Sequence, residues 1–196
     1  MKLLNRKKYW IFDMDGTLTV AQHDFLAIKQ ELGISLEQDI LTSLSNLPKE
    51  EKLQKEIQLN EIELKIAKLA IAMEGSTNLL TELNVINHKI GILTRNSYDN
   101  AIETLKAAKI DSFFKSNNII CRDKALPKPN PDGIFYLMRE WEAKPKDTIM
   151  VGDYLYDMVA GKQAGVETIY IDPSGAFPFL KDATYAVKNL NEIFYL

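Results

Sequence analysis

Two aspartates, one residue apart, give the first indication of chemistry in this sequence. Asp13 and Asp15 follow the apolar run Tyr9–Phe12 and precede Gly16, in the stretch FDMDGT. Like charges at this spacing repel, so an apolar strand would not normally end in them without a positive partner. The pair is therefore either a solvated acidic turn or a site that holds a cation.

The elements that would position these residues alternate along the chain. Short runs that are apolar on both faces and rich in Ile and Val predict parallel strands at Tyr9–Phe12, Lys89–Leu93, Asn118–Cys121, Thr148–Val151 and Thr168–Ile171. Helical patterns lie between them at Ser76–Ile86, Tyr98–Lys109, Pro131–Trp141 and Tyr154–Ala164. In the third helix we expect Asn130 as N-cap and Pro131 as the first residue. This alternation predicts an α/β fold with a doubly wound, Rossmann-like parallel sheet.

One interval contains helical patterns and no strand. Its predicted helices are His23–Leu32, Leu36–Leu47 and Lys49–Met73. The apolar residues of the third fall on more than one stripe, which indicates contacts on two sides. We therefore expect a small all-helical cap at residues 21–73, inserted after the first strand, with a core made of residues 1–20 and 74–196.

Further polar residues follow the other strands. The second strand leads into Thr94-Arg95-Asn96 and the fourth into Gly152-Asp153, with Asp157 four residues on; Lys128 lies in the proline-stiffened loop LPKPNP. In an open parallel sheet, ligands bind beyond the carboxyl ends of the strands. Four acids, a lysine and a threonine would therefore share one edge, and this set suits a divalent cation and a phosphate.

The bulk properties narrow the classes of partner. A net charge of -3 gives no reason to expect nucleic acid or an anionic membrane surface. No apolar run approaches a membrane span, and the single cysteine, Cys121, fits a reducing compartment. We expect a cytoplasmic protein, a monomer or weak homodimer, that binds a small phosphorylated metabolite and neither nucleic acid nor membrane.

Four segments together resemble a known family. In order and spacing, DMDGT, ILTRN, KPNP and VGDYLYDMVAGKQAG are similar to the four motifs of the haloacid dehalogenase superfamily. The resemblance covers Lys8 to about Ile171. A helical cap after the first motif is typical of the branch that includes phosphoglycolate phosphatases and β-phosphoglucomutases.

The resemblance implies a role for each acid. Asp13 would be the nucleophile that forms an aspartyl-phosphate. Mg²⁺ would be held by Asp13, Asp153 and the backbone carbonyl of Asp15. The side chain of Asp15 would protonate the leaving alcohol and then activate water. Asp157 would orient Lys128 or a water bound to the metal.

The resemblance also implies the phosphate contacts. Gly16 would let the chain turn so that N–H groups face the phosphate, Thr94 would donate its hydroxyl, and Arg95 and Asn96 would help through their backbone. Lys128 would offset the charge shared by Asp13 and the phosphoryl group. Together these roles imply a Mg²⁺-dependent phosphatase.

Several alternatives stay open. The resemblance implies that the second aspartate, Asp15, favours phosphoryl transfer over carbon–halogen cleavage. A phosphosugar mutase would use the same core residues, however, and a non-catalytic phosphate-binding or regulatory module could keep them. Asp157 could instead complement the start of the following helix. Arg95 could point to solvent or reach substrate. Residues such as His23 and Asp24, at the entrance to the insertion, are more often helix-start residues than substrate contacts.

Overall fold

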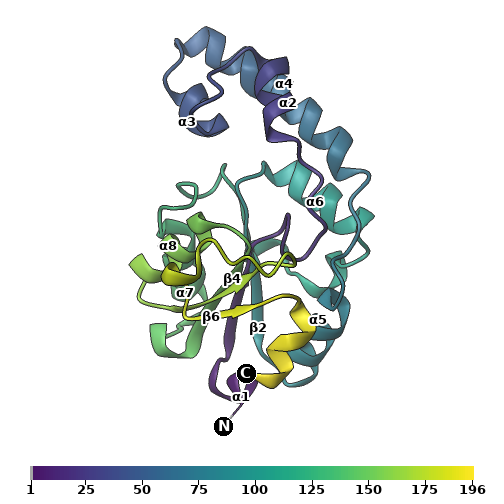
Figure 1. Cartoon of the computed structure of the whole chain (residues 1–196), viewed down its shortest axis with the longest axis vertical. Helices are drawn as coiled ribbons and strands as arrows, with labels where there is room; N and C mark the ends of the chain where they lie inside the picture. The colour runs from purple at the N-terminus through teal and green to yellow at the C-terminus, as the bar shows by residue number, and fades with distance from the viewer. Residues whose placement is uncertain (1) are drawn as a thin grey trace.

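A six-stranded parallel sheet forms the centre of the computed structural model, which describes residues 2–196 (Figure 1). The strand order is β3-β2-β1-β4-β5-β6. The strands are β1 (Tyr9–Phe12), β2 (Lys89–Leu93), β3 (Ile119–Ile120), β4 (Thr148–Gly152), β5 (Glu167–Ile171) and β6 (Tyr185–Val187). Phe12 is in register with Ile92 on one side and with Val151 on the other, so β1, β2 and β4 end within one residue of the same level.

Helices cover both faces of the sheet, as the predicted doubly wound fold requires. Along β1, Trp10 and Phe12 face one apolar cluster and Ile11 faces another. The first cluster receives residues of α5 (Ser76–Val85) and α6 (Tyr98–Ala107), and the second receives residues of α7 (Asp132–Trp141) and α8 (Leu155–Gln163). The α/β prediction is confirmed.

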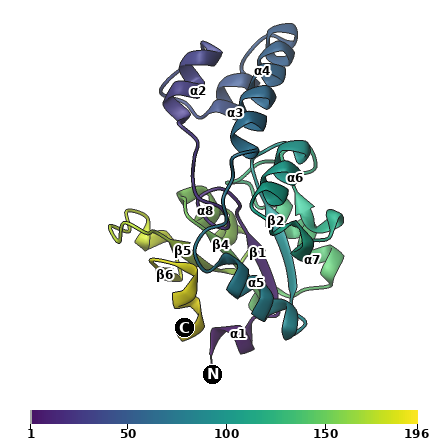
Figure 2. The ribbon, with the colours of Figure 1, turned by 90° about the vertical axis from the view of Figure 1, so that its right-hand side faces the viewer.

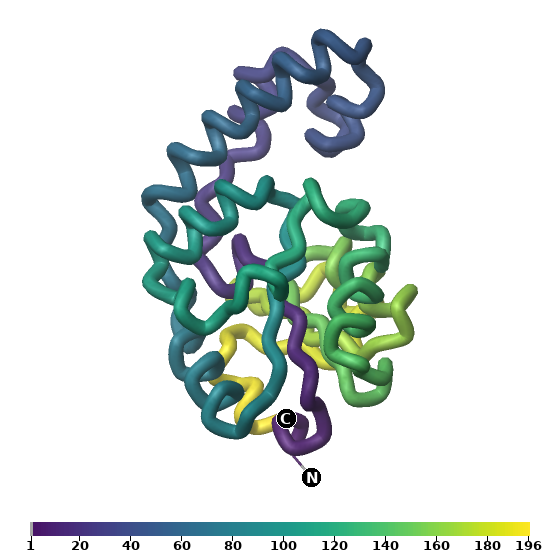
Figure 3. The backbone as a smooth tube through the Cα atoms, turned by 180° about the vertical axis from the view of Figure 1, so that it is seen from behind, coloured from purple at the N-terminus to yellow at the C-terminus, as the bar shows by residue number. Residues whose placement is uncertain are grey.

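Three of the helices between β1 and β2 form the cap: α2 (Phe25–Leu32), α3 (Ile40–Ser45) and α4 (Lys49–Ala67) (Figure 2). They pack around a small apolar cluster of their own, made by Ile28, Leu32, Leu44, Leu59 and Ile62. Seen from behind, the cap rises from one side of the core and overhangs it (Figure 3). The inserted helical cap is confirmed, whereas its boundaries at 20/21 and 73/74 stay a prediction.

The chain that enters the cap pairs with the chain that leaves it. Val20 donates its N–H to the carbonyl of Ile71 (2.9 Å), and Met73 donates to Leu18 (2.8 Å). Because residues 71–73 make these extended contacts, the last cap helix ends at Ala67, and the predicted extension to Met73 is wrong.

Other differences have local causes. Asn118 uses its side chain to donate to the Ile90 carbonyl (3.1 Å) and lies in a 3-10 turn, so β3 is shorter than predicted. Pro131 occupies the N-cap position of α7, and Asn130 accepts from Asp132 N–H (3.0 Å), so the predicted cap is wrong by one residue. The sequence did not predict α1 (Leu3–Arg6) or β6. Within residues 2–196, no helix is long and apolar enough to cross a membrane.

Candidate active site

The turn after β1 separates the two opening aspartates from the core. Asp13 donates its N–H to the Val151 carbonyl (2.8 Å), which extends the contact between β1 and β4 by one residue. Met14 is fully buried in the apolar cluster, so Asp13 and Asp15 lie away from it. Gly16 has φ +87°, in the left-handed region that favours glycine, and donates to the Thr19 carbonyl (2.8 Å).

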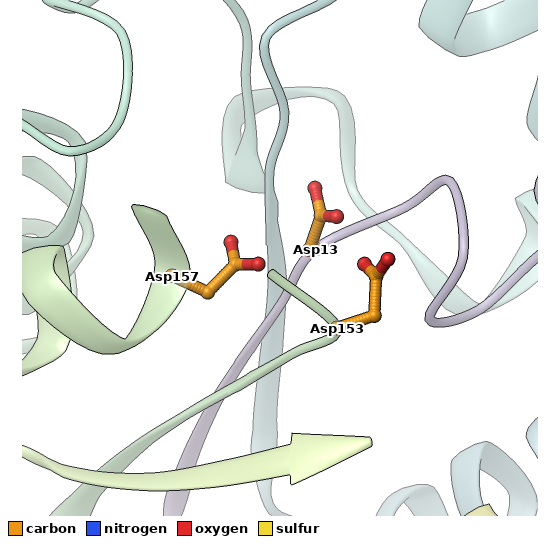
Figure 4. A group of neighbouring side chains, drawn as sticks. All are labelled: Asp13, Asp153 and Asp157. Atoms are coloured by element: carbon orange, nitrogen blue, oxygen red, sulfur yellow. The ribbon is translucent and has the colours of Figure 1, made fainter. Parts of the chain in front are cut away.

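Three carboxylates meet at this edge of the sheet. Oxygens of Asp13, Asp153 and Asp157 lie within 4.8 Å of one another, and Figure 4 shows the three side chains directed toward a common space. Thr17 donates its hydroxyl to Asp153 (3.1 Å). Burial, and then the neighbouring charges of Asp13 and Asp157, raise the pKa of Asp153. Clustered carboxylate oxygens of this kind fit a hard divalent cation.

Lys128 supplies a positive charge to this cluster. Its Nζ donates to Asp13 Oδ1 (2.5 Å) and to Asp157 Oδ1 (2.6 Å), and the side chain is almost fully buried. Burial alone would lower the pKa of Lys128, but the charges of Asp13 and Asp157 outweigh it and raise the pKa. Lys128 is therefore held as a cation beside Asp13.

Asp157 has two partners. One oxygen accepts from Lys128, and the other accepts from the N–H of Tyr154 (3.0 Å) at the start of α8. Burial raises its pKa, and the charge of Lys128 opposes this shift. Both readings of Asp157, as an orienting residue for Lys128 and as a helix-start residue, thus match its contacts.

The carboxylate of Asp15 lies outside the three-carboxylate cluster. Asn96 donates its side-chain amide to Asp15 Oδ2 (2.8 Å), and His23 Nδ1 lies 4.0 Å from Oδ1. Burial raises the pKa of Asp15 to about 6, while the charge of His23 opposes the shift. His23, whose role the sequence left open between helix start and substrate contact, therefore lies beside the site.

The loop after β2 carries Thr94, Arg95 and Asn96, whose side chains make different contacts. Thr94 is buried at the end of β2, and its hydroxyl oxygen accepts from Asn96 N–H (3.2 Å). The side chain of Asn96 binds Asp15. The guanidinium of Arg95 is partly exposed and pairs with Asp39 of the cap rather than with the carboxylate cluster. The sequence patterns gave no signal for the Asp39 contact.

A cavity of about 350 Å³ separates the core site from the cap. Its core side includes Asp13, Asp15, Thr94, Lys128 and Asp153. The cap contributes the apolar side chains of Phe25, Ile28, Ile40, Leu41 and Leu59, together with the polar or charged side chains of His23, Lys29, Asp39 and Glu63. The cavity therefore has a charged floor on the core side, and a cap side that combines apolar and charged residues.

Comparisons with known proteins agree with this architecture. The family model of haloacid dehalogenase-like hydrolases matches residues 10–171. A haloacid dehalogenase-like hydrolase domain-containing protein of Arabidopsis thaliana is 34% identical over 187 residues, which cover 85% of this chain and 71% of that protein. The chain belongs to the haloacid dehalogenase-like hydrolase family.

Two further similarities differ in how much of the chain they cover. The pyrophosphatase PpaX of Anoxybacillus flavithermus is 41% identical over 80 residues, covering 41% of this chain and 37% of that protein. A crystal structure described as a predicted phosphoglycolate phosphatase from Haemophilus somnus has a TM-score of 0.76 and covers 97% of each chain at 16% identity. The second similarity extends over core and cap and shows the shared fold, that of the helical-cap branch.

Proposed function

We propose that this protein is a Mg²⁺-dependent phosphatase that hydrolyses a small phosphorylated metabolite through an aspartyl-phosphate on Asp13. One observation carries the proposal. The buried ammonium of Lys128 lies 2.5 Å from Asp13 at the edge where Asp153 and Asp157 also converge. A carboxylate can attack an anionic phosphate only when the negative charge is offset, and this site supplies positive charge and cation ligands together.

The donor set fits the proposed metal. Three carboxylates share the cluster with a single ammonium group, so the cluster carries more negative than positive charge when all three are ionised. Asp13, Asp153 and the carbonyl of Asp15 would hold Mg²⁺, which keeps several waters in such sites. When bound, the ion would offset the charge of Asp13 and of the phosphate.

The proposed chemistry then has two steps. A carboxylate oxygen of Asp13 attacks phosphorus, and the bond to the leaving oxygen breaks while Asp15 gives that oxygen a proton. A water molecule next attacks the phosphorus, Asp15 takes a proton from it, and the acyl phosphate separates into Asp13 and inorganic phosphate. The hydrogen bond from Asn96 and the raised pKa of Asp15 suit a group that gives and takes a proton near neutral pH.

Thr94 and Gly16 complete the proposed phosphate site. Thr94 places its hydroxyl at the end of β2, next to β1 in the sheet, where it can donate to a phosphate oxygen. Gly16 allows the turn that presents N–H groups to the same space. The names of two similar proteins, a pyrophosphatase and a predicted phosphoglycolate phosphatase, also support phosphate chemistry.

The test is phosphate release from p-nitrophenyl phosphate with Mg²⁺, with EDTA, and with the Asp13→Asn variant. We expect steady turnover only in wild-type protein with Mg²⁺. Full turnover in metal-free buffer or by the Asp13 variant contradicts the proposal. Binding of Mg²⁺ and phosphate without any turnover would instead identify a non-catalytic binding module. A subsequent screen of phosphorylated metabolites, scored for released phosphate against transferred phosphate, separates the hydrolase from a mutase.

A further inference from the structure

Besides the approach of His23 to Asp15, two groups of polar contacts join the cap to the core. Within residues 2–196, the first joins the middle of α4 to the core. Arg122 donates to both oxygens of Glu63 (3.0 and 2.9 Å) and to Asn60 Oδ1 (2.6 Å), and Asn100 donates to Glu63 Oε2 (3.0 Å). Because Glu63 is buried, this group is a fixed attachment, and we call it the anchor.

The second group is one ion pair at the other end of the cap. Arg95, in the loop after β2, pairs with Asp39 at the start of α3. Both side chains are about one quarter exposed, at 24% and 27%. Figure 1 shows α3 at the tip of the cap, over the core and away from the α4 attachment. The pair therefore joins the part of the cap that would move most if the cap opened about the anchor.

Asp39 combines two contacts in one carboxylate. It is the N-cap of α3, since Oδ1 accepts from Thr42 N–H (3.3 Å), and the same oxygen faces Arg95. Partial burial would raise the pKa of Asp39, but bonds from Thr42 and the charge of Arg95 hold it below the ordinary value. An asparagine could keep the cap bond to the helix while removing the charge that Arg95 requires.

Arg95 also contacts the catalytic loops. Its NH1 donates to the backbone carbonyl of Lys128 (2.6 Å), and its guanidinium lies 4.7 Å from the ring centroid of Tyr156. Lys128 carries the ammonium beside Asp13, and Tyr156 precedes Asp157. The planar guanidinium can bind a carboxylate and a carbonyl at the same time, so one side chain connects the cap tip to the loop that carries Lys128.

We propose that Arg95 is a positioning residue that couples cap closure to the placement of Lys128, with Asp39 as its partner in the closed cap. The coupling to turnover rests on the phosphatase function proposed above. Closure presents Asp39 to Arg95, which fixes the guanidinium against the Lys128 carbonyl. Opening removes Asp39, and the Lys128 loop then loses part of its support while the cavity admits substrate or releases product.

The first test needs no substrate. Asp39→Asn keeps an N-cap and removes the charge; Asp24→Asn is the matched control, because Asp24 is the N-cap of α2 (3.0 Å to Ala27 N–H) and has no ion pair within residues 2–196. Hydrogen exchange should rise in peptides covering 36–47 and 126–130 for Asp39→Asn and not for Asp24→Asn. Equal exchange in the two variants at both segments overturns the coupling, whatever the protein's activity.

The second test uses p-nitrophenyl phosphate with Mg²⁺. Loss of the pair should lower kcat/KM about fivefold in Asp39→Asn, with kcat reduced as well as KM raised, because Lys128 is less well held. Arg95→Lys, which keeps the charge but not the two-way contact, should lower kcat more than it raises KM. If Arg95 instead binds substrate and Asp39 merely competes for it, Asp39→Asn will raise kcat/KM, and that result overturns the proposal.

Discussion

Gly16 and Asp153 are in direct contact across the end of the sheet: a Cβ placed on Gly16 would lie 2.3 Å from Asp153 Oδ2. The turn after β1 thus leaves just enough room for the carboxylate that follows β4. Any side chain at position 16 would have to displace Asp153, and so would disturb the proposed metal site.

We therefore expect Gly16→Ala to abolish the stabilisation that Mg²⁺ gives and to lower turnover of p-nitrophenyl phosphate at least about 100-fold. Gly33→Ala is the control, since Gly33 also has positive φ (+63°) but its nearest neighbour is Lys55 Nζ at 3.8 Å. It should cost about 1 kcal/mol of stability and keep the response to Mg²⁺. Thermal unfolding with and without Mg²⁺ separates the two; a normal Mg²⁺ response in Gly16→Ala would contradict the contact.

The two opening aspartates should fail differently when replaced. Asp13→Asn removes the nucleophile, so it should form no phosphoenzyme with any leaving group. Asp15→Asn keeps the nucleophile but lacks the base for the second step, so phosphoenzyme should accumulate from an aryl or acyl phosphate that needs no proton donor. Mass spectrometry with Mg²⁺ should find the phosphoryl increment on the peptide carrying Asp13, in the Asp15 variant alone. The increment on that peptide of Asp13→Asn would refute the assignment.

The carboxylate cluster should make the metal-free protein sensitive to pH. Burial and the charges of Asp13 and Asp157 raise the pKa of Asp153 to about 9, against 3.8 for the free group. The folded state then binds this proton more tightly than the unfolded state, so stability falls as pH rises toward 9. Mg²⁺ binds the ionised form, so its stabilising effect should grow over the same range.

The measurement is Tm between pH 6 and 9, in EDTA and in Mg²⁺, for wild type and Asp153→Asn. The variant lacks the titrating group, so its Tm in EDTA should change less with pH. If Tm in EDTA changes equally with pH in the two proteins, the titration of Asp153 is not the cause of the pH dependence.

The anchor between α4 and the core should contribute strongly to stability. Glu63→Ala would leave Arg122 without its carboxylate in a mostly buried position, and we expect a loss of about 3 kcal/mol. Lys52→Ala, which breaks the exposed Lys52–Glu56 pair (3.7 Å), should cost less than about 0.5 kcal/mol. The free energy of unfolding of each variant is measured by urea denaturation. Similar losses in the two variants would mean that Glu63 and Arg122 form no effective attachment.

The positions of the core acids could be predicted because they depend on local patterns. Asp13 and Asp153 each follow an apolar run, and the carboxyl ends of neighbouring parallel strands lie at one edge. Predicting the position of Lys128 requires one more rule, which is that the loop before a helix lies at the carboxyl edge of a parallel sheet. Those rules place the residues near each other, but they do not say which oxygen each one contacts.

Contacts between the cap and the core could not be predicted in this way. The pairs Asp39–Arg95 and Glu63–Arg122 depend on how the cap lies over the core, and no local periodicity encodes that arrangement. The same holds for His23 beside Asp15. The strand β6 was missed because it is short and only its last residue is buried, so the apolar signal is weak.

The paired ends of the cap have a consequence for folding. β1 and β2 are neighbours in the sheet, yet the whole cap separates them in the chain. A cap that folds around its own cluster brings Val20 and Ile71 together, and so shortens the loop that the β1–β2 contact must close. We therefore expect the folded cap to shorten the loop between β1 and β2 during folding, much as a crosslink would. The Leu44→Ala substitution would leave a cavity in the apolar cluster of the cap and destabilise it. We expect this variant to refold more slowly than wild type in stopped-flow measurements.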